Sequence, residues 1–146
     1  MSSISIEKRV ISASAAHTAV AAAIAHGEKI GVSINAAVVD SSGILCAFLR
    51  MPESFTYSVS IAIDKAKTAA GFGAAPHELY SAIKDNRALE LGLIRRDDCV
   101  LFGGGFPIYD GDMMIGGIGV SGATEEQDME CAEAGRQAVL ALLSKA

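Results

Sequence analysis

Tryptophan is absent from this sequence, and aromatic residues supply only 5% of its 146 positions. Proteins that hold single-stranded nucleic acid stack the bases on aromatic side chains, and few are available here. Basic residues are also in the minority, because 12 Lys and Arg stand against 17 Asp and Glu, for a formal net charge of −5. Nucleic acids and anionic membranes both require a basic face. The composition therefore predicts that neither is the main partner.

Long apolar runs are missing too, although 51% of the residues are hydrophobic and only 20% are charged. No stretch approaches the ~18 apolar residues that a membrane-spanning helix needs. The segment Met1–Arg9 lacks a basic region followed by an apolar run and a cleavage site, so it does not resemble a signal peptide. The apolar content excludes a disordered chain, and the length suits one domain. We therefore expect a single domain over residues 1–146, located in the cytoplasm.

Cysteine and histidine are few, and their spacing does not suit a metal site. Cys46, Cys99 and Cys131 are far apart, without a C-x-x-C or a Cys/His finger spacing. We expect them to be reduced and mostly buried. His17 and His26 are nine residues apart on one predicted helix, which at ~100° per residue places them on opposite faces. The sequence therefore predicts no bound metal.

Helical signals occur in four segments. An Ala-rich stretch without proline begins near Ser5, and Gly31 supplies a stop signal. Pro76 is favourable as the first residue of a helix, and Thr124 with Gln127 has the pattern of a capping box. The predicted helices are Ser5–Lys29, Thr56–Ala70, Pro76–Arg87 and a final helix from Thr124 to Ser144, with no assignment for Leu89–Asp98.

Strand signals predict a sheet built mainly from hairpins. Asp40–Gly43 is a tight polar turn, and Asp110-Gly111 is a strong two-residue hairpin signal. The predicted strands are Ile34–Asp40, Ile44–Arg50, Cys99–Phe102, Phe106–Tyr109 and Met113–Val120. We therefore expect an α/β protein of the α+β class, with a mainly antiparallel sheet of about five strands. The first hairpin is apolar on both faces, so it should lie inside a sheet that is covered on each side.

Two glycine motifs invite a ligand-binding interpretation. Gly117–Gly122 is a literal G-x-G-x-x-G, but one predicted helix is all that follows it in this sequence, so the second strand of a dinucleotide-binding unit is missing. Gly103, Gly104 and Gly105 are not followed by Lys and Ser or Thr, so they do not form a P-loop. This bend is either a bulge or a concave row of N–H groups that receives an oxygen-rich ligand.

Charged residues on the second predicted helix are candidates for a site. Lys65 and Lys67 diverge by about 200°, so one can face solvent while the other reaches inward. A solvated face is one interpretation, and the other is an anion site that a lysine forms with Arg50 at the mouth of the sheet. His77, beside Pro76, is expected to be structural or exposed. No Ser/His/Asp or Cys/His order is evident, and no predicted helix offers a clean pair of carboxylates that would face a pocket.

Three segments carry a family resemblance when they are taken together: Val38–Met51, Ala62–Ala69 and Phe102–Asp128. Within them lie Val-Val-Asp-x-x-Gly, Ala-x-x-Lys-Ala-x-Thr-Ala, Phe-Gly-Gly-Gly-x-Pro-Ile and Ile-Gly-Gly-Ile-Gly-Val-Ser-Gly-Ala. The combination resembles the GlcG/HbpS-like family, which includes the C-terminal domain of PduO-type corrinoid adenosyltransferases. The resemblance covers nearly the whole chain. One departure is Pro52-Glu53-Ser54, where the family tends to carry an Asp-Gly-Ala-like segment.

This resemblance implies a profilin-like layering with a five-stranded antiparallel sheet, and homo-oligomers that are often of even order. Its functional implications are diverse. Some members resemble haem or corrinoid binders, others are accessory proteins encoded with small-molecule catabolic enzymes, and some are reported as enzymes that act on small carboxylated compounds. The Pro52-Glu53-Ser54 loop would border a ligand site.

Three functions follow as hypotheses. The leading one is a small-ligand-binding accessory protein of a catabolic pathway, with haem or another tetrapyrrole as ligand and otherwise no cofactor. The second is a cofactor-independent hydrolase or deaminase of a small carboxylated intermediate, in which Arg50 anchors the carboxylate and Lys65, Asp64 or Glu53 transfers protons. The third is a structural assembly subunit. Whether the chain is an enzyme stays open on the sequence.

The binding residues depend on which ligand is considered. The axial ligand of a haem would be His17, an imidazole on the long first helix, with small residues such as Ala13 or Ala16 against the tetrapyrrole. A carboxylate would be held by Arg50 and by the N–H groups of Gly103–Gly105. We also expect a homo-oligomer, because the Ala-rich first helix and the high apolar fraction suggest more apolar surface than one core can cover.

Overall fold

The structure, a computed structural model, describes residues 3–145. It contains an antiparallel sheet with the strand order β2-β1-β4-β3. The strands are β1 (Asn35–Asp40), β2 (Leu45–Arg50), β3 (Gly105–Asp110) and β4 (Met113–Ser121). The helices are α1 (Ala13–Ile30), α2 (Tyr57–Phe72), α3 (Pro76–Ile83), α4 (Arg87–Leu93) and α5 (Glu125–Leu143). The predicted α+β class and antiparallel sheet are confirmed, with four strands in the described residues instead of five.

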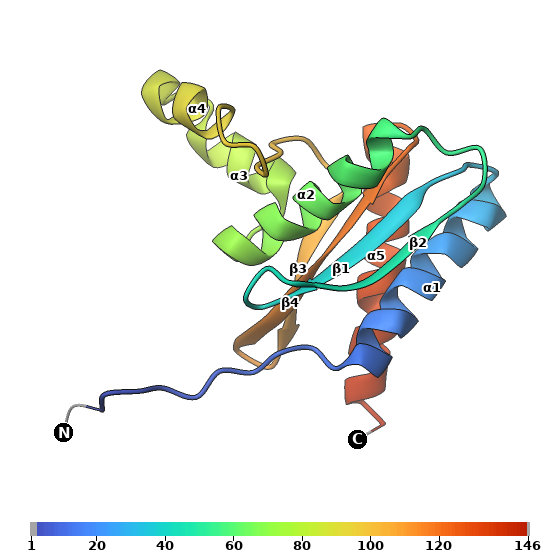
Figure 1. The fold of residues 1–146 in the computed structure, drawn as a ribbon, viewed down its shortest axis with the longest axis horizontal. Helices are drawn as coiled ribbons and strands as arrows, with labels where there is room; N and C mark the ends of the chain where they lie inside the picture. Colours follow the sequence, from blue (N-terminus) through green and yellow to red (C-terminus); the bar gives the residue numbers. More distant parts are fainter. Residues whose placement is uncertain (1–2, 146) are drawn as a thin grey trace.

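Helices cover both faces of the sheet (Figure 1). α1 and α5 lie side by side on one face, and α2 lies across the other. Successive side chains of β1 point to opposite faces of the sheet. Ala36 and Val38 pack in the core beneath α1 and α5, whereas Ala37 and Val39 pack in the core beneath α2. α3 and α4 extend from the end of α2 away from the body of the molecule. In the described part of the chain, no helix is long and apolar enough to cross a membrane.

The predicted strand Cys99–Phe102 is wrong. The N–H of Val100 donates to Thr68 Oγ1 on α2 at 3.0 Å, and the N–H of Gly103 donates to Glu125 Oε1 on α5 at 2.6 Å. The side chains of Thr68 and Glu125 therefore accept hydrogen bonds from backbone N–H groups that would otherwise be available to pair with a neighbouring strand. The segment is apolar enough to be a strand, but it runs as a loop toward β3.

The first helix is shorter than predicted. It begins at Ala13 instead of near Ser5, because Ser12 is its N-cap and accepts a hydrogen bond from the N–H of Ala15. The residues that precede the cap are not helical, and the N–H of Ile11 bonds to a carbonyl of β4. Only the part of the segment that can pack on α5 and the sheet is therefore helical.

The predicted helix Pro76–Arg87 ends four residues early, and a separate helix follows it. α3 ends at Ile83, and Asn86 then caps α4 by accepting a hydrogen bond from the N–H of Leu89. Asn favours caps over helix interiors because its side chain competes for backbone groups. Part of the segment left without an assignment is therefore helical.

Two local motifs are confirmed. Thr124 and Gln127 form the capping box that begins α5. The turn at Asp110-Gly111 joins β3 to β4, and Gly111 has a φ of 63°, which glycine adopts without strain.

The first hairpin lies at the edge of the sheet, so the prediction that it is covered on each side is wrong for β2. β1 is buried between β2 and β4. β2 has one neighbouring strand, and α2 packs chiefly on the other three strands. Leu45, Cys46 and Leu49 are consequently exposed. The expectation of mostly buried cysteines therefore fails for Cys46, whereas Cys131 is buried.

The glycines of β4 allow α2 to lie directly on the sheet. A Cβ atom at Gly117 would come within 2.5 Å of the carbonyl oxygen of Ala66, and one at Gly119 would overlap the carbonyl oxygen of Ala62. Neither backbone can move without disturbing the helix or the strand. The G-x-G-x-x-G pattern is thus explained here by close packing between a helix and a strand.

We expect Gly119→Ala to lower the free energy of unfolding by about 3 kcal/mol, because the added methyl group pushes α2 off the sheet. Gly71→Ala is the matched control, because Gly71 lies on α2 and a Cβ atom there would meet no described atom within 4 Å. The control should leave stability unchanged or raise it by up to about 1 kcal/mol. Urea denaturation measures both, and equal stability of the two variants would contradict this account of the packing.

Candidate functional site

A buried ion pair lies at the end of the sheet where β1 and β3 begin and β4 ends. Lys65 on α2 reaches past β4, and its Nζ lies 3.1 Å from Asp128 Oδ2 on α5. The two side chains are only 1% and 5% exposed. Nζ also donates to the carbonyl of Val120 at 2.8 Å and lies 5.0 Å from the centre of the Phe102 ring. Asp128 accepts a second hydrogen bond, from the N–H of Ala123 at 3.0 Å.

Burial opposes the charge on both partners. It lowers the pKa of Lys65 from its ordinary value, although the nearby carboxylate of Asp128 raises it in part. It raises the pKa of Asp128, although Lys65 and the N–H of Ala123 act in the opposite direction. The contact between the two partners, and at least one further hydrogen bond to each, offset part of this cost of burial.

The Gly103–Gly105 bend packs against this pair. Gly104 has a φ of 128°, and a Cβ atom there would lie 2.6 Å from Lys65 Nζ and 2.6 Å from the carbonyl oxygen of Val120. The carbonyl of Gly104 accepts the N–H of Val120, and the N–H of Gly103 is taken by Glu125. The glycines therefore make room for protein atoms, and a role in ligand binding stays a prediction.

Arg50 lies at the same end of the sheet but at its opposite edge. It pairs with Asn35, and Asn35 pairs with Ser121, so β1 and β4 separate it from β3. Three strand spacings amount to roughly 14 Å. Arg50 instead donates to the carbonyl oxygen of Ser54 at 2.9 Å. The structure does not bring Arg50 to the Gly103–Gly105 bend.

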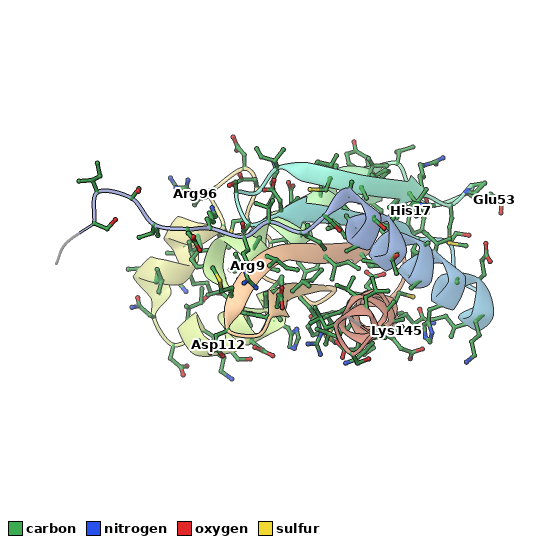
Figure 2. All side chains as sticks on the ribbon, turned by 90° about the horizontal axis from the view of Figure 1, so that it is seen from below. Arg9, His17, Glu53, Arg96, Asp112 and Lys145 are labelled. Atoms are coloured by element: carbon green, nitrogen blue, oxygen red, sulfur yellow. The ribbon has the colours of Figure 1, made fainter. Side chains whose placement is uncertain are left out.

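A cleft of about 440 Å³ opens beside Arg50, and we call it the Ser54 cleft. It is lined by the segment after β2 (Glu53, Ser54, Phe55), by Val32 and Ser33, and by Gly122, Ala123, Thr124 and Gln127. Figure 2 places Glu53 beyond the end of β2. With a φ of 71°, Glu53 is the one non-glycine residue at positive φ among residues 3–145. The Pro52-Glu53-Ser54 departure therefore forms part of a cleft wall.

A buried amide lies next to the Ser54 cleft. Asn35 is fully buried, and its Oδ1 accepts a hydrogen bond from Ser54 Oγ at 3.3 Å. Its Nδ2 has no hydrogen-bond partner within the described chain. Such a group is costly to leave unsatisfied in a protein interior.

A second cleft of about 440 Å³ opens on the other side of the α5 N-terminus, and we call it the His77 cleft. Tyr80, Ile94, Leu101 and Phe102 give it apolar walls, and Glu90 and Glu125 give it two carboxylates. His77 packs edge-on against Phe106, with ring centres 5.9 Å apart. Its Nδ1 is buried and has no hydrogen-bond partner in the described residues.

The residues proposed for proton transfer do not converge. Lys65 is buried against Asp128, whereas Asp64 lies near Lys67 and Asp98, and burial raises the pKa of its carboxyl group. Glu53 is exposed in the Ser54 cleft. Across residues 3–145, no cluster of His, Cys, Asp and Glu suits a metal ion.

His17 is exposed on α1 (Figure 2) and makes no hydrogen bond to any described residue. The side chains of Ala13 and Ala21 share its face at i−4 and i+4. Ala16 is fully buried and faces the core, so it does not offer a surface to a ligand beside His17.

Sequence reasoning gave no role to Asp128, Asn35 or Phe102. Asp128 ends the third resembling segment and Lys65 lies in the second, but nothing in the sequence shows that they meet. A lysine among alanines on a packed helix is the signal that could have prompted a search for its counterion.

Comparison with known proteins agrees with this architecture. Residues 11–137 match the family described as haem-degrading and HbpS-like. The chain belongs to the HbpS-like family. A corrinoid adenosyltransferase PduO of Citrobacter freundii is 36% identical over 118 residues, which are 80% of this chain but 35% of that protein. The chain thus spans about a third of the length of this relative.

Two solved structures share the fold at similar identity. Klebsiella pneumoniae protein ORFY is 32% identical with a TM-score of 0.89, over 97% of this chain and 98% of that one. A PduOC:haem complex is 31% identical with a TM-score of 0.81, over 88% of this chain and 94% of that one. The family resemblance expected from the sequence is confirmed.

We expect Lys65→Met to lower the free energy of unfolding by about 3–5 kcal/mol near neutral pH, because it leaves Asp128 buried without its counterion. Without Lys65, the pKa of Asp128 in the folded state rises further above its unfolded value. The folded variant then binds the proton more tightly than the unfolded chain does, so its deficit should shrink as the pH falls from about 8 to about 5.

Urea denaturation at each pH measures this deficit relative to the wild type. Lys67→Met, on the same helix but half-exposed, should change stability by less than about 0.5 kcal/mol. Adding Asp128→Asn to Lys65→Met should recover part of the loss, because the amide keeps an oxygen for Ala123. A deficit of Lys65→Met that is the same at every pH contradicts the buried-pair interpretation.

Proposed function

We propose that this chain is a small-ligand-binding accessory protein of a catabolic pathway and that its ligand is haem or a related tetrapyrrole. The observation that carries the proposal is the 31% identity and common fold with a protein whose structure is a haem complex. Membership of a family described as haem-degrading supports it further. Bound haem would supply an iron centre with open axial positions, and the protein would supply a ligand and an apolar surface.

The α1 surface fits a haem in two respects. The imidazole of His17 is exposed and forms no hydrogen bond with a described residue, so it is available to an iron atom. The small side chains of Ala13 and Ala21 flank it, so a flat macrocycle can approach. Leu45 and Leu49 on β2, which is packed beside α1, add exposed apolar area. We therefore propose His17 as the axial ligand.

Titration of the protein with haemin tests this proposal. We expect a Soret band that shifts and saturates at one haemin per chain, and we expect His17→Ala to shift or abolish it. His26→Ala is the matched control, because His26 lies elsewhere on α1 and its Nε2 is 2.5 Å from Glu130 Oε2. A spectrum that is unchanged in His17→Ala removes His17 from the site, and the absence of saturable binding to the wild type rejects the haem proposal.

We also propose that the chain is a homo-oligomer. Ile44, Leu45, Leu49, Phe55 and Tyr57 are exposed on β2 and in the segments next to it. An edge strand with exposed apolar side chains is a surface that proteins usually cover. Light scattering at micromolar concentration should give a multiple of the 15.0 kDa chain mass, and a monomeric mass would reject this proposal.

A further inference from the structure

The His77 cleft has walls suited to an aromatic ring. Tyr80 is 40% exposed, Phe102 is 48% exposed and Ile94 is 58% exposed, and they face a single cleft of about 440 Å³. Leu101 adds a further apolar surface. A flat ligand between these side chains would remove apolar area from water at several contacts at once.

The charges that line this cleft have one sign. Glu90 and Glu125 are its charged lining residues, and no lysine or arginine is among the described residues that line it. Glu125 is held in place because its Oε1 accepts the N–H of Gly103. Lys65 lies beneath the Phe102 ring, but its charge is opposed by Asp128 at 3.1 Å. The cleft therefore favours a cation and disfavours a carboxylate, including the propionates of a haem.

His77 is a further polar residue in the lining of the His77 cleft. Its ring lines the cleft, and its buried Nδ1 has no partner in the described chain. The carboxylates of Glu90 and Glu125 are hydrogen-bond acceptors in this cleft, and a ligand that carries N–H groups would supply donors to them.

We propose that the His77 cleft binds a small planar aromatic cation that carries N–H donors, such as an aryl amidinium or a protonated heteroaromatic amine. The ring lies against Phe102 and Tyr80, and the cationic N–H groups face Glu90 and Glu125. This site lies elsewhere on the molecule from the haem surface proposed on α1, and its carboxylates suit a cation, whereas a haem carries carboxylates of its own. It therefore does not depend on the haem proposal.

Benzamidine is the probe, because benzamide and benzoate have nearly the same shape but are neutral and anionic. We expect benzamidine to shift the amide resonances of Tyr80 and Phe102 saturably in an NMR titration of the full chain. Benzamide should bind about tenfold more weakly, since it lacks the charge for the carboxylates and the aromatic faces. Benzoate should not saturate. Equal affinity for benzamide, or saturable binding of benzoate, overturns the proposal.

Glu90→Gln should raise the dissociation constant of benzamidine about three- to fivefold, the effect of one partly exposed charge. Glu126→Gln is the matched control, because it removes the same charge from an exposed position on α5 outside the cleft and should leave the affinity unchanged. An equal effect of the two variants, or shifts confined to the Ser54 cleft, overturns the assignment. Displacement of benzamidine by haemin would also overturn it, because the cleft would then accept an anionic tetrapyrrole.

Discussion

The ammonium group of Lys65 is almost completely removed from water, and the end of the sheet is organised around its pairing with Asp128. Desolvating both ions costs several kcal/mol, so the pair persists only with further hydrogen bonds, which Val120 and Ala123 supply. The close approach of the Gly103–Gly105 bend completes the enclosure and allows no side chain at Gly104. One interaction thus joins α2, the end of β4, the bend and α5.

The same arrangement produces two clefts that differ in chemistry. Asp128 fixes the N-terminus of α5, and the Ser54 cleft and the His77 cleft lie on either side of it. The first has a polar loop at its wall and Arg50 beside it. The second is apolar, aromatic and acidic. A haem carries two carboxylates, which the negative charge of Glu90 and Glu125 in the His77 cleft disfavours, so we propose the exposed imidazole of His17 on α1 as its ligand.

Membership of the HbpS-like family agrees with the resemblance drawn from the three motif segments, and the structure gives these motifs physical roles. Lys65 and Asp128 are the buried pair, and Gly103–Gly105 makes room for it. Gly117 and Gly119 admit α2 to the sheet. The motifs therefore describe how the fold packs, and they do not by themselves identify a ligand.

Local chemistry alone determined the capping box at Thr124 and the hairpin at Asp110-Gly111, because each depends on neighbours in sequence, and the two hairpins indicated a mainly antiparallel sheet. The pairing of β1 with β4, which joins the two hairpins, was decided by the tertiary structure. The errors arose where distant groups compete for the same backbone. Cys99–Phe102 has strand composition, but Thr68 on α2 takes the N–H of Val100. β2 is as apolar as β1, yet its place at the sheet edge leaves it exposed. Whether Lys65 faced solvent or the interior was likewise decided by Asp128, 63 residues away, since only the folded chain brings a counterion to a buried charge.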